Sequence, residues 1–425
     1  MTELCNLKAM RLKFSLICGL LLAAMLVRSQ QEFRFQVLAG DYDRFNCPVS
    51  VDLSSAKLEL NNHHFQLFLL DGKNEIPVSS QLESGKSDRL WFVLNDKLPK
   101  GKSREYIYKA TEEVVTDSKI LLKKNQQGLK LIFNEKPILN YQYAEVYPPE
   151  GVNPLFKRSG FIHPLWSPGG EELTRIQAPD HYHHYGIWGP WTKTHINGRE
   201  VDFWNLFKGQ GTVRFADFIS EVEGSVFSGF SALQQHIDFG SKGADQVALN
   251  EMLDVTAWNI DPKGEVWLID YTSRLNSPLD SGILLDAYRY GGGIGFRATE
   301  KWTRENSSVL TSEGNDRLTA DGTKARWCIV EGEAASGRSG ILFMSHPSNR
   351  EYPEPMRVWP VDANGGRGDV YFQFCPIRHN DWKIERGTNY SQKYRMLIFD
   401  GELSREKAER YWQAFAYPPQ IEVKN

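Results

Sequence analysis

Short runs with the two-residue period of a β-strand recur along nearly the whole chain, and they constrain the fold more than any other feature. Near the start, Phe33, Phe35 and Val37 alternate with residues on the opposite face, as in a half-buried strand. Later, Glu265–Leu275 is apolar on both faces, which is typical of a strand covered on each side in a layered sandwich. Strands and helices do not alternate, which argues against a Rossmann fold or a β/α-barrel. We therefore predict an all-β protein built on a large antiparallel β-sandwich.

Charged and polar stretches divide this pattern into two parts. The first strand-like runs are separated by turn signals and predict a small β-sandwich-like module over residues 30–115. A polar stretch from Thr111 to Lys119 follows, and residues 116–425 are predicted to form the main β-sandwich domain. One helix is expected near the end, from Glu406 to Phe415, with Ser404 as its N-cap and two prolines after it.

A basic segment and a short apolar run open the chain. Lys8, Arg11 and Lys13 precede the apolar residues 14–27, which end at Arg28. This run is too short to span a bilayer comfortably and is typical of a signal peptide, predicted here as residues 1–29. We expect a periplasmic or secreted protein with no membrane span in its mature chain. The net charge of −3 gives no electrostatic basis for binding nucleic acid.

The candidate site is a histidine-rich stretch from Phe161 to Trp204. It holds five of the ten histidines of the chain: His163, His181, His183, His184 and His195. Imidazole changes charge near neutral pH and is also the commonest metal ligand, so the cluster predicts either proton transfer or metal binding. If residues 180–185 are extended, His181 and His183 point to one face and His184 to the other. We expect His181, His183 and His184 to be catalytic, with Asp202 orienting one imidazole and raising its basicity.

The residues do not decide between acid/base chemistry and a metal. His181 and His183 would supply two ligands to a divalent metal, and a third would come from the set His163, His195, His346 or Asp202. No complete ligand signature is present, which favours acid/base use, and no cofactor is assigned from the sequence. The three cysteines beyond residue 29 form no Cys-x-x-Cys pair, which argues against a thiolate zinc site.

Other residues are predicted to bind the substrate. Trp188, Trp191 and Trp204 are close to the histidines in sequence and are expected to form the walls of a cleft, with His163 beside them. Arg297 follows a glycine-rich run that would let a ligand or a second segment approach closely, and its guanidinium would hold a carboxylate or several hydroxyls. A turn-rich region contributes three further candidates: His346, Trp359 and Arg367.

Several of these motifs occur together in an order that resembles a known family. They are Ile162–Pro168, Asp180–Trp188, Val201–Trp204, Gly291–Arg297 and His346-Pro347. The set resembles the family of unknown function DUF6807, also labelled the "methane oxygenase PmoA" family, and the resemblance covers about Lys119 to Pro419. It implies a bacterial, exported β-sandwich protein, often found among sugar-degrading genes and akin to the galactose-mutarotase supersandwich.

The methane-oxygenase label does not suit this chain physically. A membrane methane monooxygenase subunit needs several apolar spans of about twenty residues. This chain has a mean hydropathy of −0.46 and one short apolar run, at the position of the signal peptide.

Three functions follow from the same residues. The first is an exported carbohydrate-active enzyme of the epimerase, lyase or hydrolase type, in which the histidines do acid/base chemistry on a small-molecule or oligosaccharide substrate. The second is a metal-dependent hydrolase or lyase with the histidines as ligands. The third is a non-catalytic glycan-binding protein.

Overall fold

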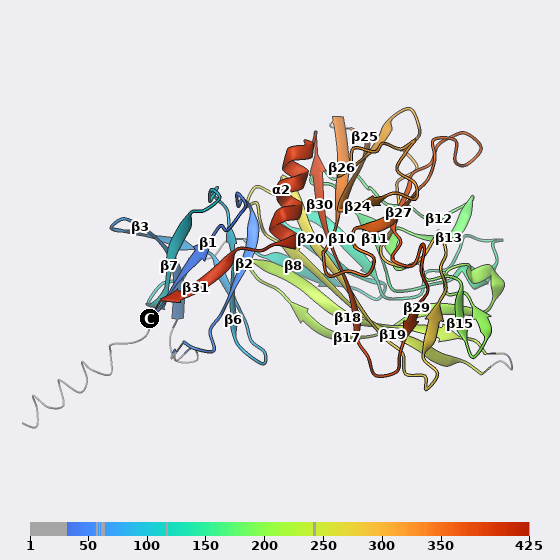
Figure 1. Ribbon diagram of the computed structural model, residues 1–425, viewed down its shortest axis with the longest axis horizontal. Coiled ribbons are helices and arrows are strands. Elements are labelled where there is room, and N and C mark those ends of the chain that lie inside the picture. The colour runs from blue at the N-terminus through green and yellow to red at the C-terminus, as the bar shows by residue number, and fades with distance from the viewer. Residues whose placement is uncertain are drawn as a thin grey trace, which may run out of the picture.

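The computed structural model describes residues 32–424 except 57, 59, 61–63, 116–117, 241–243 and 336. The predicted signal peptide, residues 1–29, lies outside the described residues. Strands make up most of the described chain, and the predicted all-β class is confirmed (Figure 1). No helix in this part of the chain is long and apolar enough to cross a membrane.

Two packed sheets form the N-terminal module. The larger sheet contains, in order, β31 (Gln420–Lys424), β1 (Glu32–Leu38), β7 (Ser103–Thr111), β3 (His64–Asp71) and β4 (Asn74–Val78). The smaller sheet contains β2 (Cys47–Asp52), β6 (Arg89–Leu94) and β5 (Ser80–Glu83). Phe33, Phe35 and Val37 are buried between them, as their alternation predicted, because every second side chain of β1 faces the other sheet.

Two large antiparallel sheets form the main sandwich. The first contains β24 (Lys324–Ala325), β27 (Glu354–Val358), β28 (Tyr371–Phe374), β22 (Gly295–Arg297), β14 (Ile187–Trp188), β11 (Phe161–Leu165), β10 (Lys136–Gln142), β9 (Gly128–Phe133) and β8 (Ile120–Lys124). The second contains β17 (Gly211–Val222), β18 (Phe227–Asp238), β19 (Gln246–Trp258), β20 (Val266–Asn276), β30 (Tyr390–Asp400), β26 (Gly337–Ser345), β25 (Trp327–Ala334) and β23 (Ser307–Thr311). Their facing side chains form one core cluster.

Strand β20 is covered on both faces, as its sequence predicted. Trp267, Ile269 and Tyr271 belong to the core between the two large sheets. Leu268 belongs to a second cluster on the outer face, together with Trp412 of the C-terminal helix α2 (Arg405–Ala416). The Ser404 side chain accepts a hydrogen bond from the Lys407 amide and caps this helix, which confirms the predicted helix and its start.

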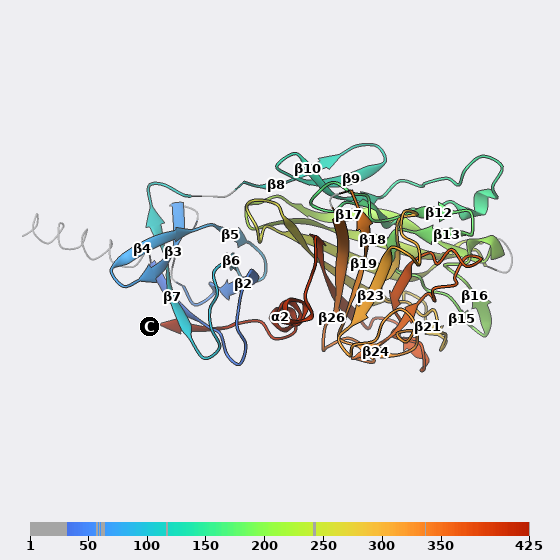
Figure 2. The same cartoon turned by 90° about the horizontal axis from the view of Figure 1, so that it is seen from above.

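Shorter elements complete the main domain at the end away from the N-terminal module. A four-stranded sheet contains β16 (Arg199–Val201), β15 (Thr194–Ile196), β21 (Ile283–Leu285) and β29 (Trp382–Ile384). A two-stranded sheet contains β12 (Ile176–Ala178) and β13 (His181–Tyr185), and two short 3-10 helices are η1 (Pro154–Phe156) and η2 (Leu206–Lys208). Figures 1 and 2 both show β12 and β13 at this far end, so the histidine strand lies distant from the N-terminal module.

Candidate functional site: a triad of histidines on one strand

An irregular hairpin carries His181, His183 and His184, the three histidines that lie within four residues of the sequence. Strand β13 pairs with β12 through Ile176 with Tyr185 and Ala178 with His181, so two steps along β12 oppose four steps along β13. The extra residues of β13 form a bulge that contains His183 and His184. Because a bulge breaks the two-residue alternation, the side chains of this segment do not follow the regular in-and-out order.

The three imidazoles converge. Ring centroids lie 4.7 Å apart for His181 and His184, 5.0 Å for His183 and His184, and 5.3 Å for His181 and His183. One nitrogen from each ring lies within 4.8 Å of the other two. The expectation that His184 points to the opposite face is therefore wrong, and the bulge is the physical reason. We call His181, His183 and His184 the triad.

Burial differs across the triad. The His181 side chain is 37% exposed, whereas His184 is 1% exposed. Neither ring nitrogen of His184 has a hydrogen-bond partner among the described residues. Four aromatic rings surround His184 with centroids 5.0–5.6 Å away: Trp188, Trp204, Trp359 and Tyr371. The triad thus has one buried member and one member that reaches solvent.

Burial also sets the charge of the two inner imidazoles. Desolvation, followed by the nearby charge of His181, lowers the pKa of His183 to about 4. Desolvation holds the pKa of His184 well below its ordinary value. Both rings are therefore neutral near pH 7, and each keeps a nitrogen lone pair that can accept a proton or bind a metal.

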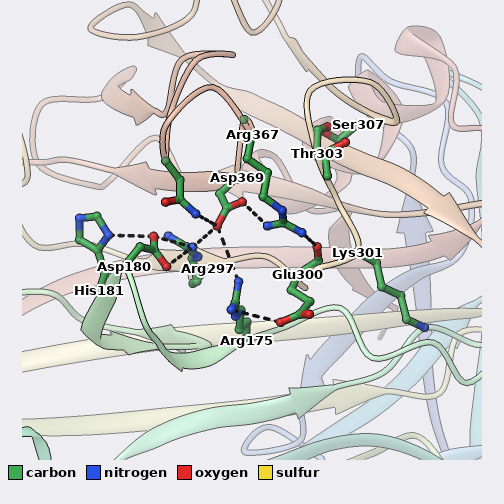
Figure 3. A network of polar contacts seen from close by, with 12 residues as sticks. Arg175, Asp180, His181, Arg297, Glu300, Lys301, Thr303, Ser307, Arg367 and Asp369 are labelled. Atoms are coloured by element: carbon green, nitrogen blue, oxygen red, sulfur yellow. Dashed lines mark hydrogen bonds and ion pairs between the residues drawn. The ribbon is translucent and has the colours of Figure 1, made fainter. Parts of the chain in front are cut away.

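A chain of ion pairs fixes His181. Its Nδ1 lies 2.9 Å from Oδ2 of Asp180, and Nη2 of Arg297 donates to the same carboxylate at 2.8 and 3.0 Å. Arg297 also donates to Asp369 at 2.5 Å, and Arg175 and Arg367 reach Asp369 from other sides. Figure 3 shows Asp369 at the centre of this network, with Asp180 between Arg297 and His181.

The electrostatics of Asp180 follow from this network. Burial alone would raise its pKa, but the hydrogen bond with His181 and the charge of Arg297 hold the pKa below its usual range. The carboxylate is therefore ionised and orients the His181 ring through Nδ1, which leaves Nε2 free.

Two predicted roles are wrong. Arg297 is 1% exposed, and its guanidinium contacts Asp180 and Asp369 and lies 4.7 Å from the Trp359 ring, so it supports the site from inside instead of gripping a substrate. Asp202 does not orient a histidine, because its carboxylate oxygens accept from Thr192, from Asn205 and from the Trp204 amide. Its charge does raise the pKa of His183, as predicted, but desolvation has the larger, opposite effect. Asp202 holds the loop that carries Trp204, and Asp180 is the aspartate that orients an imidazole.

The predicted tryptophans are also placed differently from expected. Trp188, Trp204 and Trp359 surround the triad but are 1%, 3% and 4% exposed, so they support the imidazoles and do not form open cleft walls. The indole nitrogen of Trp204 donates to the carbonyl of His183 at 2.9 Å and fixes the bulge. Trp191 belongs to a separate core cluster, where its ring lies directly over Gly292. The glycine-rich run therefore admits a second chain segment, one of its two predicted uses.

The remaining candidates lie apart from the triad. His163 on β11 is 2.9 Å from the Thr174 hydroxyl, and no ring contact joins it to the triad within the described part of the chain. His346 contacts the ring of Phe415 on α2. Arg367 bonds to Asp369 and lies at the edge of the ion-pair network, where its side chain is 38% exposed. His195, another residue predicted as a third metal ligand, pairs with Asp286 at 2.5 Å.

Sequence reasoning missed Asp180, Asp369 and Tyr290. Asp180 directly precedes His181, and that adjacency was a usable signal. Asp369 offered none, because the two arginines that it holds near the triad, Arg297 and Arg175, are 72 and 194 positions away. Tyr290, whose ring lies 5.3 Å from that of Trp204, bonds to the side chains of Arg357 and Trp359.

The fold and the site define a class: a β-sandwich protein with three converging histidines at one end of the sandwich. Within that class, the chain belongs to the family of unknown function DUF6807, whose model matches residues 128–413. The resemblance noted in the sequence is thereby confirmed. A comparison with curated proteins gave no match.

Three solved structures show weak likeness to this chain, each at a TM-score of 0.33. They are a heparan sulfate lyase from Pedobacter heparinus (9% identity; 70% of this chain and 38% of that one), a galactose mutarotase related enzyme from Lactobacillus acidophilus (10%; 67% and 100%) and a galactose mutarotase-like protein from Lactobacillus casei (8%; 66% and 99%). This chain therefore spans well under half of the heparan sulfate lyase. Likeness at this level carries no argument about activity.

Proposed function

We propose that this protein is a carbohydrate-active enzyme whose reaction centre is the triad. The observation that carries the proposal is the convergence of three imidazoles, one of them solvent-accessible, at one end of a rigid sandwich. Two neutral imidazoles beside a third that Asp180 orients are groups that can move protons in epimerase, lyase and hydrolase reactions. Desolvation of the charges of Arg297, Asp180 and Asp369 costs free energy. Such a network holds the His181 ring in one orientation, as the supporting contacts of an active-site histidine do.

Three aromatic rings beside β13, one exposed and two half-buried, favour a sugar as the substrate. Tyr182, between two triad members in sequence, packs against Phe156 with centroids 5.5 Å apart, and Phe156 stacks on Phe207 at 6.1 Å. Phe207 is 64% exposed. Sugars present flat faces of C–H groups, which pack on aromatic rings while their hydroxyls stay solvated. An oligosaccharide that crosses these rings would extend past the triad.

The proposal includes export. The basic and apolar residues at the start of the chain, 8–28, support a signal peptide. We therefore place the enzyme in the periplasm or outside the cell, where oligosaccharides are first degraded. Mass determination of the N-terminus of the mature protein tests this, and an unprocessed Met1 in the exported fraction would contradict it.

The experiment for function is a screen of oxidised and unoxidised oligosaccharides with the full mature chain. We expect His183→Ala to lower turnover of any converted sugar by about 100-fold or more while binding changes little, because general acid/base groups contribute about that much to rate. The matched control is His379→Ala, which removes an exposed histidine outside the triad.

Binding and turnover separate the alternatives. Equal loss of sugar binding and turnover in His183→Ala, or binding without any turnover in the unmodified protein, would contradict an enzyme and favour a glycan-binding protein. Isothermal titration with the converted sugar and product analysis by chromatography measure the two quantities.

A further inference from the structure

We infer that the triad binds one divalent first-row transition-metal ion through three imidazole nitrogens, with zinc as the best match. This deepens the proposed function, because an ion held by the triad would activate a water or polarise a substrate oxygen in place of direct proton transfer by the imidazoles. It rests on the proposed function only for the claim that the ion takes part in catalysis. The assignment itself stands on geometry, on a buried unpaired side chain and on the donors around the triad.

The nitrogens are close enough to share an ion. One from each of His181, His183 and His184 lies within 4.8 Å of the other two. Zinc–imidazole bonds are about 2.0–2.1 Å long, so a tetrahedral ion would hold its nitrogen ligands about 3.3 Å apart. Small rotations of the three side chains within their rotamer wells can close this gap.

His184 independently points to a ligand. It is 1% exposed, and within the described chain neither Nδ1 nor Nε2 has a hydrogen-bond partner. A buried polar nitrogen without a partner is costly, and such groups are rare in folded proteins unless a water or an ion satisfies them. The centroid of the His184 ring lies 4.7 Å from that of His181 and 5.0 Å from that of His183, so an ion held by all three rings would satisfy His184.

The second layer of contacts matches that of a metal site. Asp180 bonds to Nδ1 of His181, which leaves Nε2 as the nitrogen of this ring that can bind an ion. A carboxylate on the far nitrogen of a metal-binding histidine fixes its tautomer and raises its affinity for the ion. Arg297 and Asp369 hold Asp180 in turn.

The donors available select the kind of ion. Asp202, the nearest predicted carboxylate candidate, is occupied by Thr192, Asn205 and Lys208, and the cysteines Cys47, Cys328 and Cys375 are buried in other parts of the described chain. Three imidazoles without thiolate suit zinc, cobalt, nickel or copper better than calcium or magnesium. Three protein ligands would leave the fourth position of a tetrahedral ion for water or a substrate oxygen, as in catalytic zinc sites.

The test begins with the full mature chain, purified without a polyhistidine tag. Mass spectrometry of its metals should give about one ion per chain. After removal of the metal with a chelator, Zn²⁺ should rebind in a calorimetric titration and Co²⁺ should give visible absorption bands of a low-coordinate site. We expect His181→Ala to abolish stoichiometric binding and Asp180→Asn to weaken it by about 10–100-fold, whereas His379→Ala should bind as the unmodified protein does.

Loss of metal binding is separated from loss of folding by the use of His181→Ala instead of His184→Ala, because His184 is a buried position. His181→Ala changes a partly exposed one, and its metal-free form should unfold at the same urea concentration as the metal-free unmodified protein. Absence of metal in the purified protein together with no binding of Zn²⁺ or Co²⁺ overturns the inference. Turnover of a sugar by verified metal-free protein would contradict a catalytic role for the ion and support the proposed enzyme. Stoichiometric metal without turnover of any sugar would support the metal site and contradict the proposed enzyme.

Discussion

One carboxylate, Asp180, joins the solvent-accessible part of the site to the interior of the sandwich. It bonds to His181 on one side and to the buried Arg297 on the other. Because a buried charge without a partner is strongly unfavourable, Arg297 requires Asp180 and Asp369 in place, and they in turn restrict the movement of His181. The orientation of the partly exposed His181 ring is thus set by the ion pair between Asp180 and the buried Arg297.

A buried carboxyl outside this network, Glu354, predicts how the free energy of unfolding depends on pH. It accepts hydrogen bonds from Ser345, Asn349 and Tyr394, yet desolvation raises its pKa to about 7. The folded protein therefore keeps a proton that the unfolded chain has lost between about pH 4.5 and about pH 7, so the contribution of this group to the free energy of unfolding falls as pH rises through that window. The full effect is about 3 kcal/mol.

Glu354→Gln removes this dependence. In urea unfolding measured at steps from pH 4.5 to pH 7.5, we expect the variant to lose less stability than the unmodified protein as pH rises. Glu402→Gln, which removes an exposed carboxylate, is the control for the loss of one negative charge. Parallel pH curves for the Glu354→Gln variant and the unmodified protein would contradict the raised pKa.

The turn between β13 and β14 decides where the histidine strand lies against the first large sheet. Gly186 has a φ of 64°, and its amide donates to the carbonyl of Arg175, while its carbonyl accepts from the Arg297 amide at 2.8 Å. A side chain there would overlap the carbonyl oxygen of Ile162. Glycine is required for both the backbone angle and the close approach.

Gly186→Ala should accordingly destabilise the fold by roughly 3 kcal/mol, since backbone overlap adds to the cost of a positive φ. Gly198→Ala measures the cost of the positive φ alone, because Gly198 has a φ of 79° and open space around it. This variant should lower the free energy of unfolding by only about 1 kcal/mol. Urea unfolding measures both. Equal losses in the two variants would show that the contact with Ile162 is unimportant.

The two ends of the chain meet in one sheet. After α2 packs on the outer face of the second large sheet, β31 returns to the N-terminal module and pairs with β1, with Phe35 opposite Val423 and Val37 opposite Ile421. Figure 2 shows this final strand running from the helix back to the module. The N-terminal module is therefore completed by residues more than 300 positions later in the chain.

A chain that ends at Tyr417 lacks β31 and turns β1 into an edge strand. We expect the β1 amides to exchange hydrogen faster by about tenfold or more, because edge strands open locally with less free energy than central ones. Hydrogen exchange followed by mass spectrometry measures this, with the amides of β20 as the internal control. Unchanged exchange in β1 would mean that β31 contributes little to the module.

Local pattern was sufficient for most of the fold. Alternation predicted β1, apolar residues on both faces predicted the covered strand β20, and a serine cap with a later proline pair predicted α2. These signals are readable because strand period, capping and turn chemistry each depend on residues a few positions apart. The ordered motifs also predicted the family, which the match over residues 128–413 confirms.

The sequence by itself determined that three histidines lie within four residues on a β-strand, and it thereby located the site. Only the tertiary structure decided that His184 joins the other two, that Asp180 and not Asp202 orients an imidazole, and that Arg297 is buried. The first depends on a bulge in the pairing of β12 with β13. The others depend on the register between β14 and β22, which brings Arg297 to a carboxylate 117 residues away, and no local period encodes such a partner.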